Sequence, residues 1–230
     1  MIGPIFAVVL AAAPESYVDQ GRRLFHDPGL GKNGVACANC HSTVESEVEM
    51  GDGLIRAGHT LWGVARRPHW RGDSRRTAYP SLGDAVEVCV KLFHGAATLD
   101  PLDRQRLVSY LESISPKRGQ PPLQLQPALE ANLDYDRPKY RGGDPDRGRA
   151  LFFRACNACH PRGGVGLGPS LFGKSAVQVV LKSREGNGLL RGSRQPGAWM
   201  PFYGRDRLAD DKLADIAAFV AVLAGPEPPS

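Results

Sequence analysis

Two pentapeptides of the same pattern decide the fold of this 230-residue chain: Cys37-Ala38-Asn39-Cys40-His41 and Cys156-Asn157-Ala158-Cys159-His160. Each has the form C-x-x-C-H, which is typical of c-type haem attachment. Two thiols on one helical turn can form thioethers with one porphyrin, and the adjacent histidine then supplies the proximal nitrogen to the iron. The sequence therefore predicts two covalently bound haem c groups, with His41 and His160 as iron ligands.

A pair of zinc or redox sites built on the two CxxC elements is the alternative interpretation. Neither kind of site needs a histidine directly after the second cysteine, whereas both copies have one, at His41 and His160. We therefore prefer haem attachment. Cys89 is the one cysteine outside the motifs, and it has no partner left for a disulfide.

The sequence around the motifs also repeats. Gly-Arg-x-Leu-Phe precedes each motif, at 21–25 and 148–152, and Gly-x-x-Leu-x-Gly follows each, at 58–63 and 168–173. Each copy then closes with an amphipathic helical pattern, for which Asp103 and Asp210 are candidate N-caps. The repeat predicts an all-α fold of two tandem domains. We expect the boundaries to be a signal-like segment 1–13, a first domain 14–116, a Pro-rich linker 117–145 packed against the surface, and a second domain 146–225.

The N-terminal segment is a short apolar run that ends in Ala11-Ala12-Ala13, similar to the end of a secretory signal. Because haem c is attached outside the cytoplasm, this segment predicts a periplasmic protein. No other stretch is long and apolar enough to cross a membrane. The net charge of +5 weakly favours acidic partners, and no basic stripe interleaved with aromatic residues indicates nucleic-acid binding.

Both copies resemble class I cytochrome c domains, over most of the chain outside the linker and the signal-like segment. The resemblance implies that an opening helix, a closing helix and a short helix between them wrap each haem. It also implies that a Gly-Pro loop supports the proximal histidine through a backbone carbonyl. Pro169 matches this loop, whereas His59 stands at the matching position of the first copy and departs from the pattern.

The sixth iron ligands are less clearly marked. Met200, in Trp199-Met200-Pro201, looks like the Met-Pro ligand loop of class I cytochromes, although a core methionine is the alternative. Met200 lies 27 positions after Gly173, and Cys89 lies 26 positions after Gly63, so the repeat gives Cys89 the sixth-ligand position in the first copy. A small buried hydrophobe is the alternative for Cys89. His69 and His94 remain competing ligands. An apolar helical face surrounds Cys89, formed by Leu82, Ala85, Val86, Val90 and Phe93.

A distal cysteine on a helix, followed by a His/Met haem, resembles thiosulfate dehydrogenases and related sulfur-oxidation cytochromes. The matching positions are Gly34, the first C-x-x-C-H motif, Gly63-Val64, Arg67-Pro68, Ala85-Val86, Cys89 and Gly95. The resemblance implies chemistry on a small sulfur oxyanion at the first haem, with Cys89, Arg67 and Arg71 as candidate catalytic residues. Guanidinium groups suit oxyanions, and a basic cluster is present in this copy: Arg66, Arg67, Arg71, Arg75, Arg76 and Lys91.

A thiolate ligand lowers the potential of an iron and a thioether raises it, so electrons should pass from the first haem to the second. The acceptor would be a redox partner cytochrome or another electron acceptor. Two alternatives remain open. One is a pure electron carrier without substrate chemistry. The other is a dihaem cytochrome c peroxidase, because the opening stretch resembles those enzymes: Leu24-Phe25-His26-Asp27-Pro28.

Overall fold

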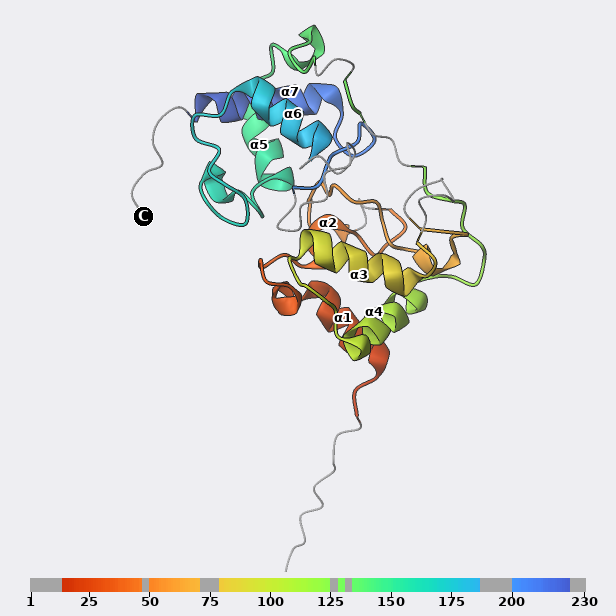
Figure 1. The fold of residues 1–230 in the computed structure, drawn as a ribbon. Helices are drawn as coiled ribbons and strands as arrows, with labels where there is room; N and C mark the ends of the chain where they lie inside the picture. Colours follow the sequence, from red (N-terminus) through yellow and green to blue (C-terminus); the bar gives the residue numbers. More distant parts are fainter. Residues whose placement is uncertain are drawn as a thin grey trace, which may run out of the picture.

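The computed structural model describes residues 14–46, 50–70, 79–124, 128–130, 134–186 and 200–223. These residues form helices and no β-strand, apart from an isolated antiparallel bridge between Trp70 and Tyr79, so the predicted all-α class is confirmed. Figure 1 shows one group of helices from each half of the sequence. Among the described helices, none has the length and apolarity needed to span a bilayer. The signal-like segment lies outside the described residues.

The N-terminal half contains α1 (Tyr17–His26), η1 (Pro28–Leu30), α2 (Cys37–Cys40), η3 (Val64–Arg66), α3 (Leu82–Phe93) and α4 (Pro101–Ser113). The C-terminal half contains η5 (Pro138–Tyr140), α5 (Pro145–Ala155), η6 (Pro161–Gly163), α6 (Ala176–Glu185) and α7 (Asp210–Val222). The opening helix that the cytochrome resemblance implies is present in this half as α1. It begins after Ser16, whose hydroxyl accepts a hydrogen bond from the Asp19 N–H, and it ends before Asp27.

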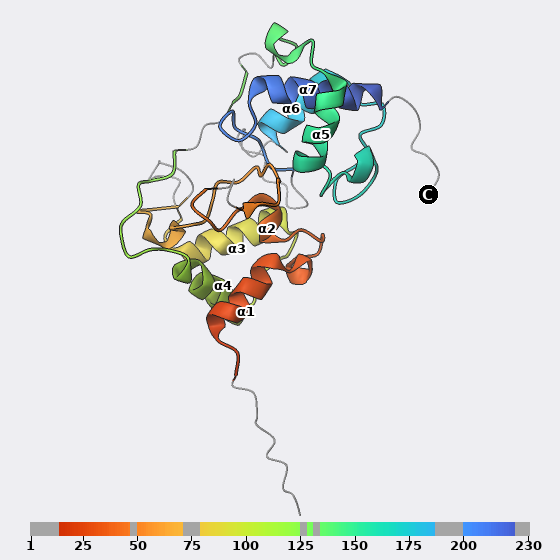
Figure 2. The same ribbon diagram turned by 180° about the vertical axis from the view of Figure 1, so that it is seen from behind.

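The same helix crossing occurs in both halves. Helix α1 packs against α4, and α5 packs against α7 (Figure 2). A Cβ atom on Gly21 would lie 2.0 Å from the Arg106 carbonyl oxygen, and one on Gly148 would lie 1.9 Å from the Asp215 carbonyl oxygen. Only glycine allows backbones to approach this closely. The repeated Gly-Arg-x-Leu-Phe element therefore marks the point where the opening helix meets the closing helix.

Both predicted helix caps are wrong. Helix α4 begins one turn earlier, because the Asp100 carboxylate accepts hydrogen bonds from the N–H groups of Leu102 and Asp103 and Pro101 occupies the first helical position. Helix α7 begins after Ala209 without a side-chain cap. The Asp210 carboxylate instead binds two guanidinium groups, which are stronger partners than a backbone amide.

The Pro-rich segment enters the core of the C-terminal half. Tyr135 and Tyr140 are 1% and 4% exposed and pack in the same cluster as Phe152 and Ile216. The Tyr135 hydroxyl donates a 2.7 Å hydrogen bond to Glu185, near the end of α6. The segment expected to be a linker packed against the surface thus contributes two aromatic rings to the core, since large aromatic rings are better buried than exposed.

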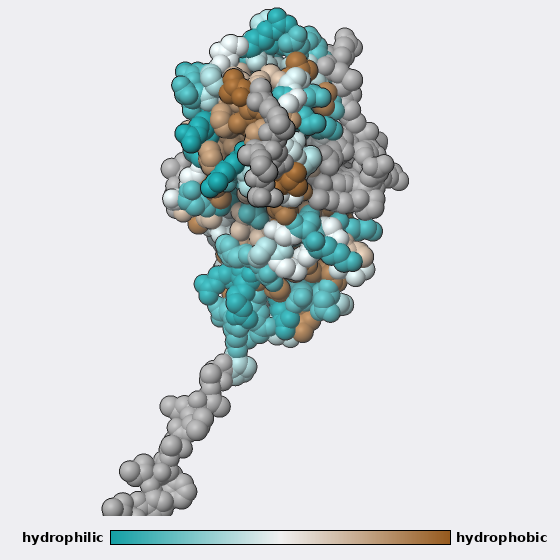
Figure 3. All heavy atoms as spheres, turned by 90° about the vertical axis from the view of Figure 1, so that its left-hand side faces the viewer, coloured by the Kyte–Doolittle hydropathy of each residue, from teal (hydrophilic) through white to brown (hydrophobic). Residues whose placement is uncertain are grey.

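Exposed apolar side chains gather on the C-terminal half on the face that Figure 3 shows, where the N-terminal half is mostly hydrophilic. The large hydrophobic residues exposed in the C-terminal half include Phe153, Val165 and Val222. Val165 follows the second C-x-x-C-H motif by a few residues.

Candidate haem sites

Each C-x-x-C-H motif forms one turn that brings two thiols and one imidazole together. In the first motif the His41 N–H donates to the Cys37 carbonyl at 2.9 Å, which closes the single turn of α2. In the second motif the His160 N–H donates to the Cys156 carbonyl at 2.9 Å, directly after α5. The two turns therefore present the same donor set at the same spacing.

Both histidine rings are held through Nδ1 by a backbone carbonyl. His41 Nδ1 lies 2.7 Å from the His59 oxygen, and His160 Nδ1 lies 2.8 Å from the Pro169 oxygen. Because a carbonyl only accepts, Nδ1 carries the proton and Nε2 has the lone pair that coordinates iron. Burial lowers the pKa of both histidines, which favours this neutral form. The Pro169 contact is the one that the cytochrome resemblance implies.

A glycine closes one side of each ring. A Cβ atom on Gly58 would lie 2.4 Å from His41 Cε1, and one on Gly168 would lie 2.1 Å from His160 Cε1. The N–H of Gly58 donates to the Cys40 carbonyl at 2.9 Å, and Gly168 does the same to Cys159 at 2.9 Å. Two thiols, an oriented imidazole and this glycine cradle fit a covalently attached haem in each half.

The two motifs lie close to each other. Burial raises the pKa of Cys40 to about 12, and the nearby thiols of Cys89 and Cys159 add to the increase. Burial also raises the pKa of Tyr203, with Cys156, Cys40 and Cys159 as further causes. The Tyr203 hydroxyl donates to the Ala155 carbonyl at 2.7 Å. Tyr203 is therefore a buried aromatic residue beside both attachment motifs.

Three residues remain candidates for the distal ligand of the first site. Cys89 lies within α3, and its pKa is raised to about 12 by burial and then by Cys37, so it lies near the first motif. His94 caps the end of α3, and burial, followed by His41, lowers its pKa to about 4. Within the described part of the chain, both ring nitrogens of His69 and the Nδ1 atom of His94 are buried without a hydrogen-bond partner.

The predicted oxyanion residues are only partly described. Arg67 Nη2 donates a 2.9 Å hydrogen bond to the Thr60 carbonyl, in the segment that follows His59, and burial lowers the pKa of Arg67. Arg71, with Arg75 and Arg76, lies outside the described residues. The role of this cluster stays a prediction.

Met200 lies in a loop that α6 holds in place. Tyr203 N–H donates to the Ser183 carbonyl at 2.7 Å, and a Cβ atom on Gly186 would lie 2.6 Å from the Met200 oxygen. Met200 itself is half-buried. Residues 187–199, including Trp199, lie outside the described residues. The role of Met200 as an iron ligand also stays a prediction.

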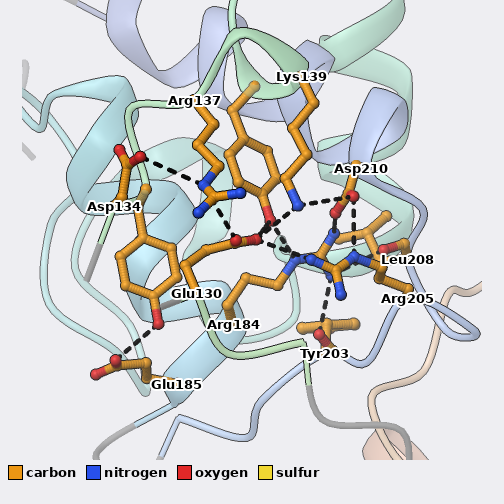
Figure 4. Close-up of polar contacts among 12 residues, drawn as sticks. Glu130, Asp134, Arg137, Lys139, Arg184, Glu185, Tyr203, Arg205, Leu208 and Asp210 are labelled. Atoms are coloured by element: carbon orange, nitrogen blue, oxygen red, sulfur yellow. Dashed lines mark hydrogen bonds and ion pairs between the residues drawn. The ribbon is translucent and has the colours of Figure 1, made fainter. Parts of the chain in front are cut away.

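Sequence reasoning missed the residue that anchors this loop. Arg184 of α6 is fully buried, and its Nη1 atom donates to the carbonyls of Tyr203 at 2.9 Å and Leu208 at 2.8 Å (Figure 4). Its Nη2 atom lies 2.6 Å from the Asp210 carboxylate. Burial acts to raise the pKa of Asp210, but hydrogen bonds from Arg205 and Arg184 hold it at about 2, so the carboxylate stays charged. Arg184 thereby fastens both ends of the loop after Met200.

A second layer ties the Pro-rich segment to the same cluster. Glu130 is 6% exposed, and it accepts hydrogen bonds from the Tyr140 hydroxyl at 2.8 Å and from Arg205 at 2.8 Å. Lys139 Nζ lies 2.7 Å from the same carboxylate. Although burial acts to raise the pKa of Glu130, the bonds from Lys139 and Tyr140 lower it. Arg205 lies 75 positions from Glu130 and the residues follow no motif, so no sequence signal joins it to the Pro-rich segment.

Residues 143–220 match the family described as cytochrome c oxidase, cbb3-type, subunit III. The matched range contains the second motif, α5 and α6 and most of α7. This part of the chain is therefore similar to cytochrome c domains, which indicates covalently bound haem c and electron transfer. The match does not extend to the N-terminal half.

A solved structure of thiosulfate dehydrogenase from Marichromatium purpuratum, in its as-isolated form, is also similar to this chain. The similarity has 17% identity and a TM-score of 0.42, and it covers 91% of this chain and 47% of that chain. This chain thus spans about half the length of that protein. No curated protein matches the sequence.

Proposed function

We propose that the protein is a dihaem c-type cytochrome that passes electrons from a haem in its N-terminal half to a haem in its C-terminal half. One observation carries the proposal: each half has a C-x-x-C-H turn, an imidazole held through Nδ1 by a carbonyl, and a glycine against the ring. The family match covers the second of these sites, and the first repeats its contacts. Haem supplies the redox chemistry, and the chain orients its iron ligands.

Unequal axial ligands set the direction of transfer in this proposal. His41 and Cys89 hold the first iron, and His160 and Met200 hold the second. Burial keeps the free Cys89 thiol protonated at neutral pH, with a pKa of about 12. Ligation to iron therefore requires loss of that proton, which the positive charge of the metal favours. The resulting thiolate lowers the first potential, and the Met200 thioether raises the second.

The proximity of the two motifs supports transfer between the haems. Cys159 is close enough to Cys40 to add to the rise in the Cys40 pKa, and Tyr203 lies beside both motifs. Electrons would leave from the second haem to a redox partner cytochrome or another acceptor. Val165, an exposed apolar residue of that half, follows the second motif by a few positions. Because haem c is attached outside the cytoplasm, we place the protein in the periplasm.

Haem stoichiometry tests the proposal directly. The wild-type chain should carry two covalently bound haems, measured as pyridine haemochrome per chain. The double variants Cys37→Ala/Cys40→Ala and Cys156→Ala/Cys159→Ala should each carry one, because thioether bonds at one motif do not depend on the other. Cys89→Ala is the control and should keep two. A wild-type chain with a single haem would contradict the proposal.

Replacing Cys89 tests the ligand set. In Cys89→Ala, we expect the low-spin thiolate signal of the first haem to disappear from the electron paramagnetic resonance spectrum. Carbon monoxide should then bind that haem in the reduced protein, because its sixth position is open. His69→Ala and His94→Ala are the matched controls, and their spectra should equal the wild type. An unchanged spectrum in Cys89→Ala together with a changed one in either histidine variant would assign an imidazole ligand instead.

Oxidation of thiosulfate or a related sulfur oxyanion at the first haem is the enzymatic extension of this proposal. Its support is the position of Cys89 near the first motif, with Arg67 in the same half. Thiosulfate added to the oxidised wild type without oxygen should reduce it, and Cys89→Ala should lose this response. If thiosulfate does not reduce the wild-type protein, electron transfer without substrate oxidation remains as the function. Turnover of peroxide would favour the peroxidase alternative.

A further inference from the structure

The residue that orients His41 is itself held by the other half of the chain. The His59 carbonyl lies 2.7 Å from His41 Nδ1, and the His59 side-chain Nε2 lies 2.7 Å from Asp206 Oδ2. These two side chains are 21% and 24% exposed, so water only partly competes for the contact. A carboxylate only accepts hydrogen bonds, so His59 Nε2 carries the proton. Two hydrogen bonds, linked through the covalent frame of His59, thus form a path from Asp206 to the proximal imidazole.

The second site does not have such a path, although its backbone contact is the same. Pro169 stands at the position of His59, and its ring fixes φ but has no side-chain donor or acceptor. The two sites therefore use different means to steady one carbonyl: a stiff ring in the second and a side chain bonded across the halves in the first. Within the described residues, the His59 N–H donates no backbone hydrogen bond, so proline at this position would break none.

A parallel contact joins the same loop to the first motif. Arg207 Nε donates to the Arg56 carbonyl at 3.1 Å, and Arg56 Nε donates to the Ala38 carbonyl, within α2, at 3.0 Å. Arg56 is 2% exposed, so this link is buried. The loop that begins at Met200 is therefore linked to the first motif indirectly, by Asp206 through His59 and by Arg207 through Arg56.

We infer that Asp206 is a positioning residue of the first haem site, and that it acts through His59 to orient His41. The inference rests on the proposal that the N-terminal half binds a haem. A partner that fixes the second nitrogen of a metal-bound imidazole sets the orientation and basicity of that ligand, and hence the potential of the iron. The first haem site is then incomplete without the C-terminal half.

A double-mutant cycle on the midpoint potential tests the inference. His59→Ala and Asp206→Ala should each raise the potential of the first haem and leave the second unchanged, because His41 becomes a weaker donor. Since both act through one contact, the double variant should shift the potential by less than the sum. Asp206→Asn, whose amide oxygen still accepts from His59, should shift it less than Asp206→Ala and thereby separates loss of charge from loss of positioning.

Two further variants sharpen the test. His59→Pro rebuilds the second site's arrangement, so the first haem should keep the wild-type resonance spectrum and its potential should become insensitive to Asp206→Asn. Asp211→Ala removes an exposed carboxylate from the same half and should shift neither haem. Additive shifts of the midpoint potential, or equal shifts of both haems, would overturn the inference about Asp206. If the same protein carries two bound haems, the proposed function still holds. A wild-type chain with one haem would overturn both.

Discussion

Gly148→Ala should lower the free energy of unfolding of the C-terminal half by about 3 kcal/mol, the upper part of the range for overpacked cores. The added Cβ atom would lie 1.9 Å from the Asp215 carbonyl oxygen and 2.9 Å from Phe219 Cβ. The first of these is a backbone atom within α7, so it cannot turn aside as a side chain can. In an exposed helix the same change stabilises, because alanine has the higher helix propensity. A loss of stability in Gly148→Ala, rather than a gain, therefore indicates the close crossing of α5 and α7.

Gly83→Ala is the matched control for this change. Gly83 also lies in a helix, but the three atoms nearest to its added Cβ all belong to the guanidinium end of the Arg104 side chain, the nearest at 2.6 Å. That end can move, so we expect a change within about 1 kcal/mol. Denaturant unfolding of the haem-loaded protein gives both values. Equal stabilities of Gly148→Ala and wild type would mean that α5 and α7 do not cross as described.

Arg184→Leu should lower the stability of the C-terminal half by about 3–5 kcal/mol, the range for breaking a buried ion pair by removing one partner. The change strips the Tyr203 and Leu208 carbonyls of their shared donor and leaves Asp210 without its buried partner. The same change frees the loop that begins at Met200. We therefore also expect the near-infrared band of methionine-ligated ferric haem to weaken or disappear.

Arg137→Leu is the control for Arg184→Leu. Arg137 pairs with Glu130 and Asp134 in the same cluster, but its side chain is 42% exposed. Exposed pairs contribute about 0–1 kcal/mol, so this variant should keep near-normal stability and an unchanged spectrum. A stable Arg184→Leu with an intact methionine band would show that the loop needs no buried anchor. A loss of stability in Arg184→Leu without a spectral change would show that Arg184 stabilises the fold but is not needed for the methionine ligand.

The local elements of this protein could be predicted from its sequence. The helices around Leu24-Phe25, Cys89 and Leu151-Phe152 follow from apolar periodicity, which a helix displays whatever it packs against. The two C-x-x-C-H turns follow from spacing alone, because residues three and four apart meet on one helical turn. The glycine that both copies share before the motif is visible in the sequence as a repeat, and the structure supplies its reason, the facing carbonyls of Arg106 and Asp215.

The helix caps could not be predicted from local patterns alone. An aspartate near the start of a helix can accept from a backbone amide or from a charged side chain that folding brings near. Asp210 binds Arg184, 26 positions away, rather than capping α7. The buried Tyr135 and Tyr140 were likewise placed in a linker, because proline content alone does not tell which aromatic rings a neighbouring helix will cover.

The amino-acid pattern is enough to predict the all-α class, the two C-x-x-C-H turns and the histidine of each turn, since these depend on residues a few positions apart. How the two halves meet follows from the folded chain alone. The His59–Asp206 contact joins residues 147 positions apart, and Arg184 gathers carbonyls from a loop beyond its own helix. Such contacts have no periodicity or spacing, because hydrogen-bond partners are selected by position in space after the backbone has folded.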